Sequence, residues 1–84
     1  YASQHSYILE LKVLSKKDFS AIVEGEFTED GKPMTKAEKQ WREAVDQIHR
    51  YAEAPRVEAL RQGTKLHLII MQFEGWELKR MEEV

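Results

Sequence analysis

Two charged residues, Glu10 and Lys12, interrupt an otherwise apolar run over residues 7–14. The run is short and rich in Ile, Leu and Val, which predicts a β-strand rather than a helix. Residues two apart share a face of a strand, so a carboxylate and an ammonium stand side by side, while the apolar residues at odd numbers occupy the other face. Charges beside a hydrophobic layer cost free energy unless they are paired or coordinate a ligand. The pattern therefore indicates either an ion pair at a sheet edge or a functional pair.

A second pair, Gln47 and Tyr51, lies in a stretch with helical periodicity. Residues four apart are neighbours on one face of a helix, so the amide and the phenol stand next to each other. Two interpretations stay open for this pair by itself. Tyr51 can pack between helix and sheet with Gln47 in solvent, or both residues can serve a site.

The helix that carries this second pair is predicted to begin at Thr35. Thr35 and Glu38 match a capping box, in which each side chain satisfies the other's backbone amide. Pro55 ends the helix near residue 53 or 54, and a short second helix follows over 55–60, stopped by Gly63. The apolar residues of the first, longer helix recur at spacings of three and four and form one stripe: Ala37, Trp41, Ala44, Val45, Ile48 and Ala52.

Residues 15–34 form a long connection before this helix, well above the usual length of about 4–6 residues. Its Asp30-Gly31 pair marks a turn. Its apolar residues Phe19, Ile22, Val23 and Phe27 can pack onto the body as a short strand or turn. We interpret the connection as a whole as a mobile surface insertion rather than as a substrate-contacting loop.

Residues 65–73 are nearly all apolar in their centre, which predicts a strand buried on both faces. A tight turn at 74–75 and an alternating antiparallel strand over 76–81 follow, with Trp76 assigned to the core. The order of elements is strand, crossover helix, strand and hairpin strand, an α/β arrangement with a mixed sheet. The crossover predicts that the first two strands are parallel neighbours or near-neighbours. We expect the core to contain Trp41, Val45, Ile48, Leu68, Ile69 and Ile70.

Composition limits the class of protein. Eighty-four residues suffice for one small domain, and 42% hydrophobic with 33% charged residues indicates a globular chain. A net charge of −2 excludes a strongly basic protein that coats nucleic acid, but not a local basic surface. The absence of Cys excludes thiolate metal sites and fits a cytoplasmic location, and no stretch approaches the length of a membrane span. Because the chain opens without Met close to its most apolar strand, we expect a C-terminal piece of a longer protein.

Both polar pairs resemble motifs of one nuclease superfamily. Glu10-Leu11-Lys12 is similar to the E-x-K half of the PD-(D/E)XK nuclease superfamily, and residues 47–51, Gln-Ile-His-Arg-Tyr, resemble the Q-x-x-x-Y motif that follows it in the RecB-like branch. The resemblance implies metal-assisted phosphodiester hydrolysis. Glu10 and the Leu11 carbonyl, with an upstream Asp, would hold Mg²⁺ or Mn²⁺, and Lys12 would place or deprotonate water or stabilise charge. Gln47 and Tyr51 would lie beside the metal and orient DNA or the catalytic groups.

A closer resemblance covers residues 7–12, 44–48, 68–70 and 75–78. These runs are similar to the C-terminal nuclease-like domain of bacterial proteins that carry an AAA-type ATPase-like domain at the N-terminus and are abundant in Bacteroides-like anaerobes. The resemblance implies a partial restriction-endonuclease-like core over residues 1–84, a single truncated domain that lacks the N-terminal part of the fold.

The resembling family's metal-binding Asp precedes the E-x-K strand, and Asp18 and Asp30 follow it. We therefore expect the metal in the intact domain only and no cleavage by these 84 residues alone. Expected partners are nucleic acid, the ATPase-like domain and a second copy of the chain, and no membrane. Two alternatives remain: an interaction or assembly module on the same fold, and a domain that recognises nucleic acid without cutting it. The three histidines have no metal-ligand spacing and are interpreted as incidental: His5, His49 and His67.

Overall fold

A parallel pair of long strands forms the centre of the fold. In the computed structural model, which describes residues 4–57 and 63–84, β1 (His5–Leu14) runs beside β4 (Lys65–Glu74). β5 (Glu77–Glu83) returns antiparallel to β4, so the three-stranded sheet has the order β1-β4-β5. The predicted α/β class, the mixed sheet and the parallel first pair are confirmed.

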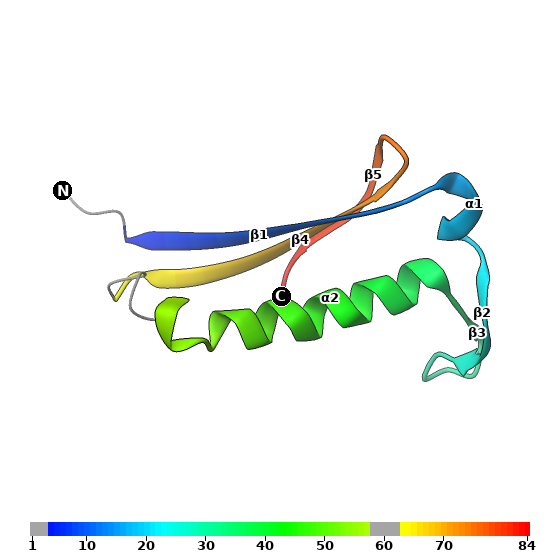
Figure 1. Ribbon diagram of the computed structural model, residues 1–84, viewed down its shortest axis with the longest axis horizontal. Helices are drawn as coiled ribbons and strands as arrows, with labels where there is room; N and C mark the ends of the chain where they lie inside the picture. The colour runs from blue at the N-terminus through cyan, green and yellow to red at the C-terminus, as the bar shows by residue number, and fades with distance from the viewer. Residues whose placement is uncertain (1–3, 58–62) are drawn as a thin grey trace.

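The crossover helix α2 (Lys36–Ala52) lies against one face of this sheet (Figure 1). Its N-terminus is where the sequence places it, since the Thr35 hydroxyl accepts a hydrogen bond from the Glu38 amide at 3.1 Å. The return contact differs from the predicted one, because the Glu38 carboxylate accepts from the Thr35 hydroxyl at 3.3 Å. Glu53 forms the C-cap, as expected before Pro55. Residues 55–57 are helical, and the rest of the predicted second helix lies outside the described residues.

Residues 15–34, predicted as a mobile surface connection, contain regular structure. Ser15 caps a short helix α1 (Lys16–Phe19), and β2 (Ile22–Phe27) pairs antiparallel with β3 (Pro33–Thr35) in a second, two-stranded sheet. Gly31, at φ 84°, lets the chain reverse between these strands, where Thr28 N–H donates to the Lys32 carbonyl at 2.8 Å. The short strand that Ile22, Val23 and Phe27 allow is present as β2, whereas the interpretation as a mobile insertion missed its pairing with β3, because the apolar residues there are few and mostly exposed.

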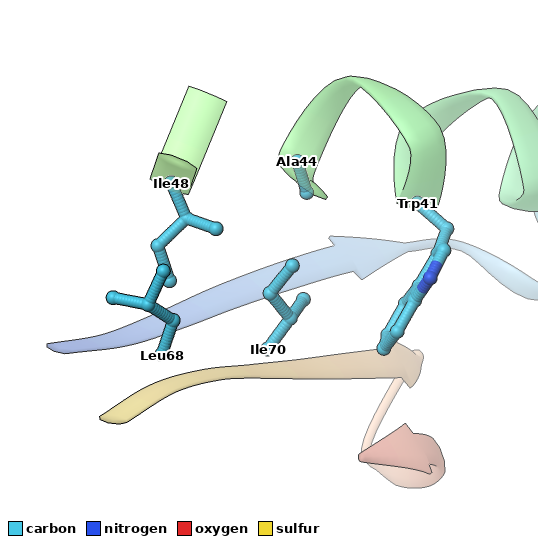
Figure 2. Packing of buried hydrophobic residues seen from close by; sticks show 5 residues of the cluster. All are labelled: Trp41, Ala44, Ile48, Leu68 and Ile70. Carbon is cyan, nitrogen blue, oxygen red and sulfur yellow. The ribbon is translucent and has the colours of Figure 1, made fainter. Parts of the chain in front are cut away.

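The core lies between α2 and the covered face of the sheet. Trp41, Ala44 and Ile48 extend from the helix toward Leu68 and Ile70 of β4 (Figure 2). All five are buried, and Ala44 and Ile70 are fully inaccessible. The helical stripe and this part of the predicted core are confirmed, with Val45 packed at the margin of the cluster.

The opposite face of the sheet is not covered within the described part of the chain. Figure 1 shows α2 on one side of the three strands only. The prediction that β4 is buried on both faces is therefore wrong, and Ile69 is half-buried on the side away from the helix. Trp76, assigned to the core, is fully exposed in the turn between β4 and β5. One helix covers one face, and hydrophobicity alone does not show which face that is.

Among residues 4–57 and 63–84, none of the helices combines the length and the apolar character that a membrane-spanning helix requires.

Candidate functional site

Lys12 joins the two predicted motifs. Its ammonium nitrogen lies 3.4 Å from Glu10 Oε1 and donates a hydrogen bond of 3.4 Å to Gln47 Oε1. Strand alternation sets Glu10 and Lys12 on the β1 face that α2 covers, and the helix then brings Gln47 above them. The side chains of Lys12 and Glu10 are 29% and 22% exposed, so water reaches a pair that the fold only half buries.

Tyr51 completes the set on the same side of the molecule. A hollow of about 330 Å³ between β1 and α2 is lined by Glu10, Gln47, Tyr51 and their apolar neighbours Ile8, Leu9 and Ile48. Tyr51 is exposed, which argues against the interpretation that it packs between helix and sheet. The structure thus brings Glu10, Lys12, Gln47 and Tyr51 together, whereas the Leu11 side chain is exposed on the other face of β1.

A second hollow, of about 310 Å³, continues from Gln47 toward the start of α2. It contains Lys12 and Gln47 together with Ala44 of the apolar stripe and four residues of α2 that the sequence did not assign to the site: Lys36, Lys39, Gln40 and Glu43. Their recurrence at spacings of three and four with Gln47 is the signal that could have found them. We call the two adjoining hollows the β1–α2 groove.

Acidic residues of α1 and β2 form ion pairs with two of the groove lysines. Lys39 Nζ donates to Glu26 Oε2 at 2.6 Å, and this hydrogen bond with the Glu26 charge raises the pKa of Lys39 above its usual value. Lys36 Nζ lies 3.4 Å from Asp18 Oδ1. These pairs tie β2 and α1 to the helix and place two further ammonium groups in the hollow that contains Lys12.

A buried amide sets the register of the helix on the sheet. Gln72 is 3% exposed, and its Nε2 donates to the Ala37 carbonyl at 2.7 Å and to Gln40 Oε1 at 3.0 Å. Gln40 in turn donates to the Val13 carbonyl at 3.4 Å. Buried amides must find such partners, so this chain of bonds links β4, α2 and β1. Gln72 was overlooked in the sequence because it interrupts the apolar strand only once.

The described residues do not by themselves form a divalent metal site. They contain no group of three or more His, Cys, Asp or Glu side chains placed to hold an ion. Mg²⁺ prefers six oxygen ligands including one or two carboxylates. The two carboxylates of the groove line different hollows, Glu10 with Lys12 beside it in one and Glu43 in the other. Asp18 and Asp30 pair with Lys36 and Lys32, away from Glu10.

The histidines lie apart from this groove. His5 Nδ1 and His67 Nε2 are 2.8 Å apart where β1 and β4 begin, and His67 Nδ1 is 2.9 Å from Glu83 Oε2. The sequence gives no hint of this contact, because it arises from the parallel register of β1 and β4. His49 is exposed on α2, as expected.

Comparison with protein families gives one match, to a sequence model described as PD-(D/E)XK nuclease superfamily, over residues 1–83. No curated protein and no solved structure matches the chain. The matched region includes both polar pairs and every described element of the fold.

Proposed function

Because the chain belongs to the PD-(D/E)XK nuclease superfamily, we propose that the domain takes part in phosphodiester hydrolysis of nucleic acid at the β1–α2 groove. The position of Lys12 carries this proposal. Its ammonium lies 3.4 Å from both Glu10 Oε1 and Gln47 Oε1, so the strand motif and the helix motif meet in one half-buried place.

The groove residues have distinct proposed roles. The Lys12 ammonium stabilises negative charge on the phosphate oxygens or places the attacking water, and its half-buried position strengthens that interaction relative to bulk water. Gln47 orients Lys12 through its hydrogen bond, and the exposed Tyr51 contacts the nucleic-acid chain at the rim of the groove. Together they position a phosphate against β1.

Nucleases of this superfamily typically use a divalent metal ion. Glu10 and the Leu11 carbonyl are the oxygen ligands that the described part of the chain would offer to Mg²⁺ or Mn²⁺, and a further acidic ligand must join them. We therefore propose that the 84 residues alone do not cleave. From the motifs we further propose membership in the RecB-like branch, and action in the cytoplasm of a bacterium as the C-terminal domain of a protein with an ATPase-like domain.

Cleavage of plasmid and single-stranded DNA in the presence of Mg²⁺ or Mn²⁺ tests the proposal. We expect the larger protein to cleave and the 84-residue chain not to. In the larger protein, Lys12→Met should lower the rate by at least about 100-fold, the effect of removing one group that stabilises transition-state charge. The matched controls are Lys65→Met and Glu24→Gln, which change exposed charges outside the groove. Cleavage that survives both Lys12→Met and Glu10→Gln would overturn the assignment.

A second function, binding of nucleic acid without cleavage, is favoured by one observation. The groove holds three lysines, Lys12, Lys36 and Lys39, but within the described residues no cluster of metal ligands. Fluorescence anisotropy with labelled single-stranded DNA and RNA measures this directly. Lys36→Met should weaken binding and reduce the dependence on log salt by about 1, as for the loss of one phosphate contact. Salt-dependent binding with no cleavage by the larger protein would select this function.

A further inference from the structure

Two lysines of the β1–α2 groove have carboxylate partners from outside the groove. Lys39 Nζ lies 2.6 Å from Glu26 Oε2 of β2, and Lys36 Nζ lies 3.4 Å from Asp18 Oδ1 of α1. Both partners come from the segment beside the start of α2 (Figure 1). All four side chains are 42–50% exposed, and ion pairs that are this hydrated contribute little to folding stability. Their main electrostatic effect therefore falls on any other charge that approaches the same lysines.

Carboxylates offset the positive charge of the groove. Its lysine-lined hollow contains the ammonium groups of Lys12, Lys36 and Lys39. The carboxylates that pair with these lysines or line the same hollow belong to Glu10, Asp18, Glu26 and Glu43. Proteins gain much of their sequence-independent affinity for nucleic acid from contacts between phosphates and Lys or Arg. Within the described residues, that gain is reduced because every lysine of the hollow already has a carboxylate beside it.

A phosphate can reach Lys36 or Lys39 in two ways. It can replace the carboxylate on the ammonium group, or it can share the ammonium group, which has three N–H donors. Replacement leaves the carboxylate without its partner, and sharing brings two anions within a few Å of each other, where they repel strongly in a partly shielded place. Both ways lower the affinity for the phosphate relative to a lysine that has no acidic neighbour.

The acidic residues of this segment are not all placed in this way. Glu24 of β2 is exposed two positions before Glu26, and Asp30 pairs with Lys32 in the turn of the hairpin. Neither Glu24 nor Asp30 lines the groove or pairs with a groove lysine among the described residues. The segment therefore carries both the carboxylates in question and matched controls for them.

We propose that Asp18 and Glu26 compete with nucleic-acid phosphates for Lys36 and Lys39 and thereby limit the affinity of the β1–α2 groove for nucleic acid. This inference rests on the proposed function, since it requires nucleic acid to bind in the groove. Linkage makes the competition reciprocal. Neutralising either carboxylate must tighten the binding of nucleic acid, and bound nucleic acid must weaken the ion pairs between the segment and α2.

Fluorescence anisotropy of labelled single-stranded DNA with the larger protein, without divalent metal ions, tests the proposal. Glu26→Gln and Asp18→Asn should each lower the dissociation constant about two- to fivefold, the effect of releasing one exposed ion pair. Because the two pairs are separate, the double variant should lower it about tenfold. The matched control Glu24→Gln removes the same charge from the same strand, and should change the dissociation constant by less than about 1.5-fold because its charge is screened by salt.

A double-mutant cycle identifies the lysine through which Glu26 acts. In a Lys39→Met background, Glu26→Gln should have no more effect than Glu24→Gln, because the ammonium group for which the anions compete is gone. Nucleic-acid binding elsewhere in the larger protein is the same in all of these variants, so the cycle reports on the groove alone.

The outcomes separate this inference from the proposed function. Binding that weakens in Lys12→Met but is unchanged in Glu26→Gln and Asp18→Asn would overturn the competition and leave the proposed function standing. Binding that no groove lysine variant weakens would overturn both. A gain in Glu26→Gln that persists with Lys39→Met would overturn the competition, since Glu26 would then act through long-range charge. Loss of the folded far-UV circular dichroism spectrum in Glu26→Gln would overturn it too, by making the ion pair structural.

Discussion

The two faces of β1 carry different kinds of side chain and have different surroundings. The face beneath α2 carries Glu10 and Lys12, each half-buried, while the face open to solvent carries Leu9, Leu11 and Val13. In a sheet with one solvated face, the apolar side chains normally face the core. Here the charged residues lie on the covered side of the strand. The comparison teaches that β1 places its charged pair, rather than its apolar residues, beneath the helix and leaves most of the packing against α2 to another strand.

β4 explains how the fold tolerates this arrangement. Leu68 and Ile70 supply the apolar surface on which α2 packs. β1 contributes the partly buried Ile8 at the margin of this core. Within the described sheet, Glu10 and Lys12 lie on an edge strand, where both side chains stay partly open to solvent and Lys12 donates to Gln47. A charged pair at such an edge avoids the full cost of burial.

The largest expected difference in stability is between truncating a core residue on the covered side of the sheet and truncating a residue on its open face. Ile48→Ala empties a site that is 1% exposed and should lower the free energy of unfolding by about 2–5 kcal/mol. Leu9→Ala, on the open face, should lower the free energy of unfolding by less than about 1 kcal/mol. Urea unfolding measures both losses. A loss below about 0.5 kcal/mol for Ile48→Ala would show that the helix does not pack through this stripe.

A smaller effect is expected from the buried amide. Gln72→Ala removes the donor to the Ala37 carbonyl and to Gln40, and should cost about 1–3 kcal/mol. Gln4→Ala, an exposed residue, is the control. Because Gln40 also bonds to β1, the variant should increase amide hydrogen exchange in β1 near Val13. Unchanged exchange there would contradict a role in holding the helix on the sheet.

The smallest effect is expected from the charged pair. Lys12→Met should change the free energy of unfolding by less than about 1 kcal/mol, because a partly hydrated ion pair contributes little net stability. In the larger protein the same change should lower the cleavage rate by at least about 100-fold, so a residue of the site is distinguished by a large effect on activity and a small effect on stability. A loss above about 2 kcal/mol would instead make the pair structural.

Local periodicity determined several features from sequence alone. Alternation in a strand fixes that Glu10 and Lys12 share a face, and spacing in a helix fixes that Gln47 and Tyr51 do. The Thr35 cap and the helical crossover could also be predicted from the sequence, since capping and chain connectivity depend on few neighbouring residues. These predictions need no knowledge of what packs on what.

Only the tertiary structure decided which faces are covered. Lys12 reaches Gln47 across 35 residues of sequence, and Gln72 bonds to Ala37 across the same separation. β1 and β4 pair between residues about 60 positions apart, which sets the position of α2 and leaves Trp76 in solvent. Periodicity marks two faces on each strand, but the free energy of covering one of them depends on the packing of distant elements, which no local pattern contains.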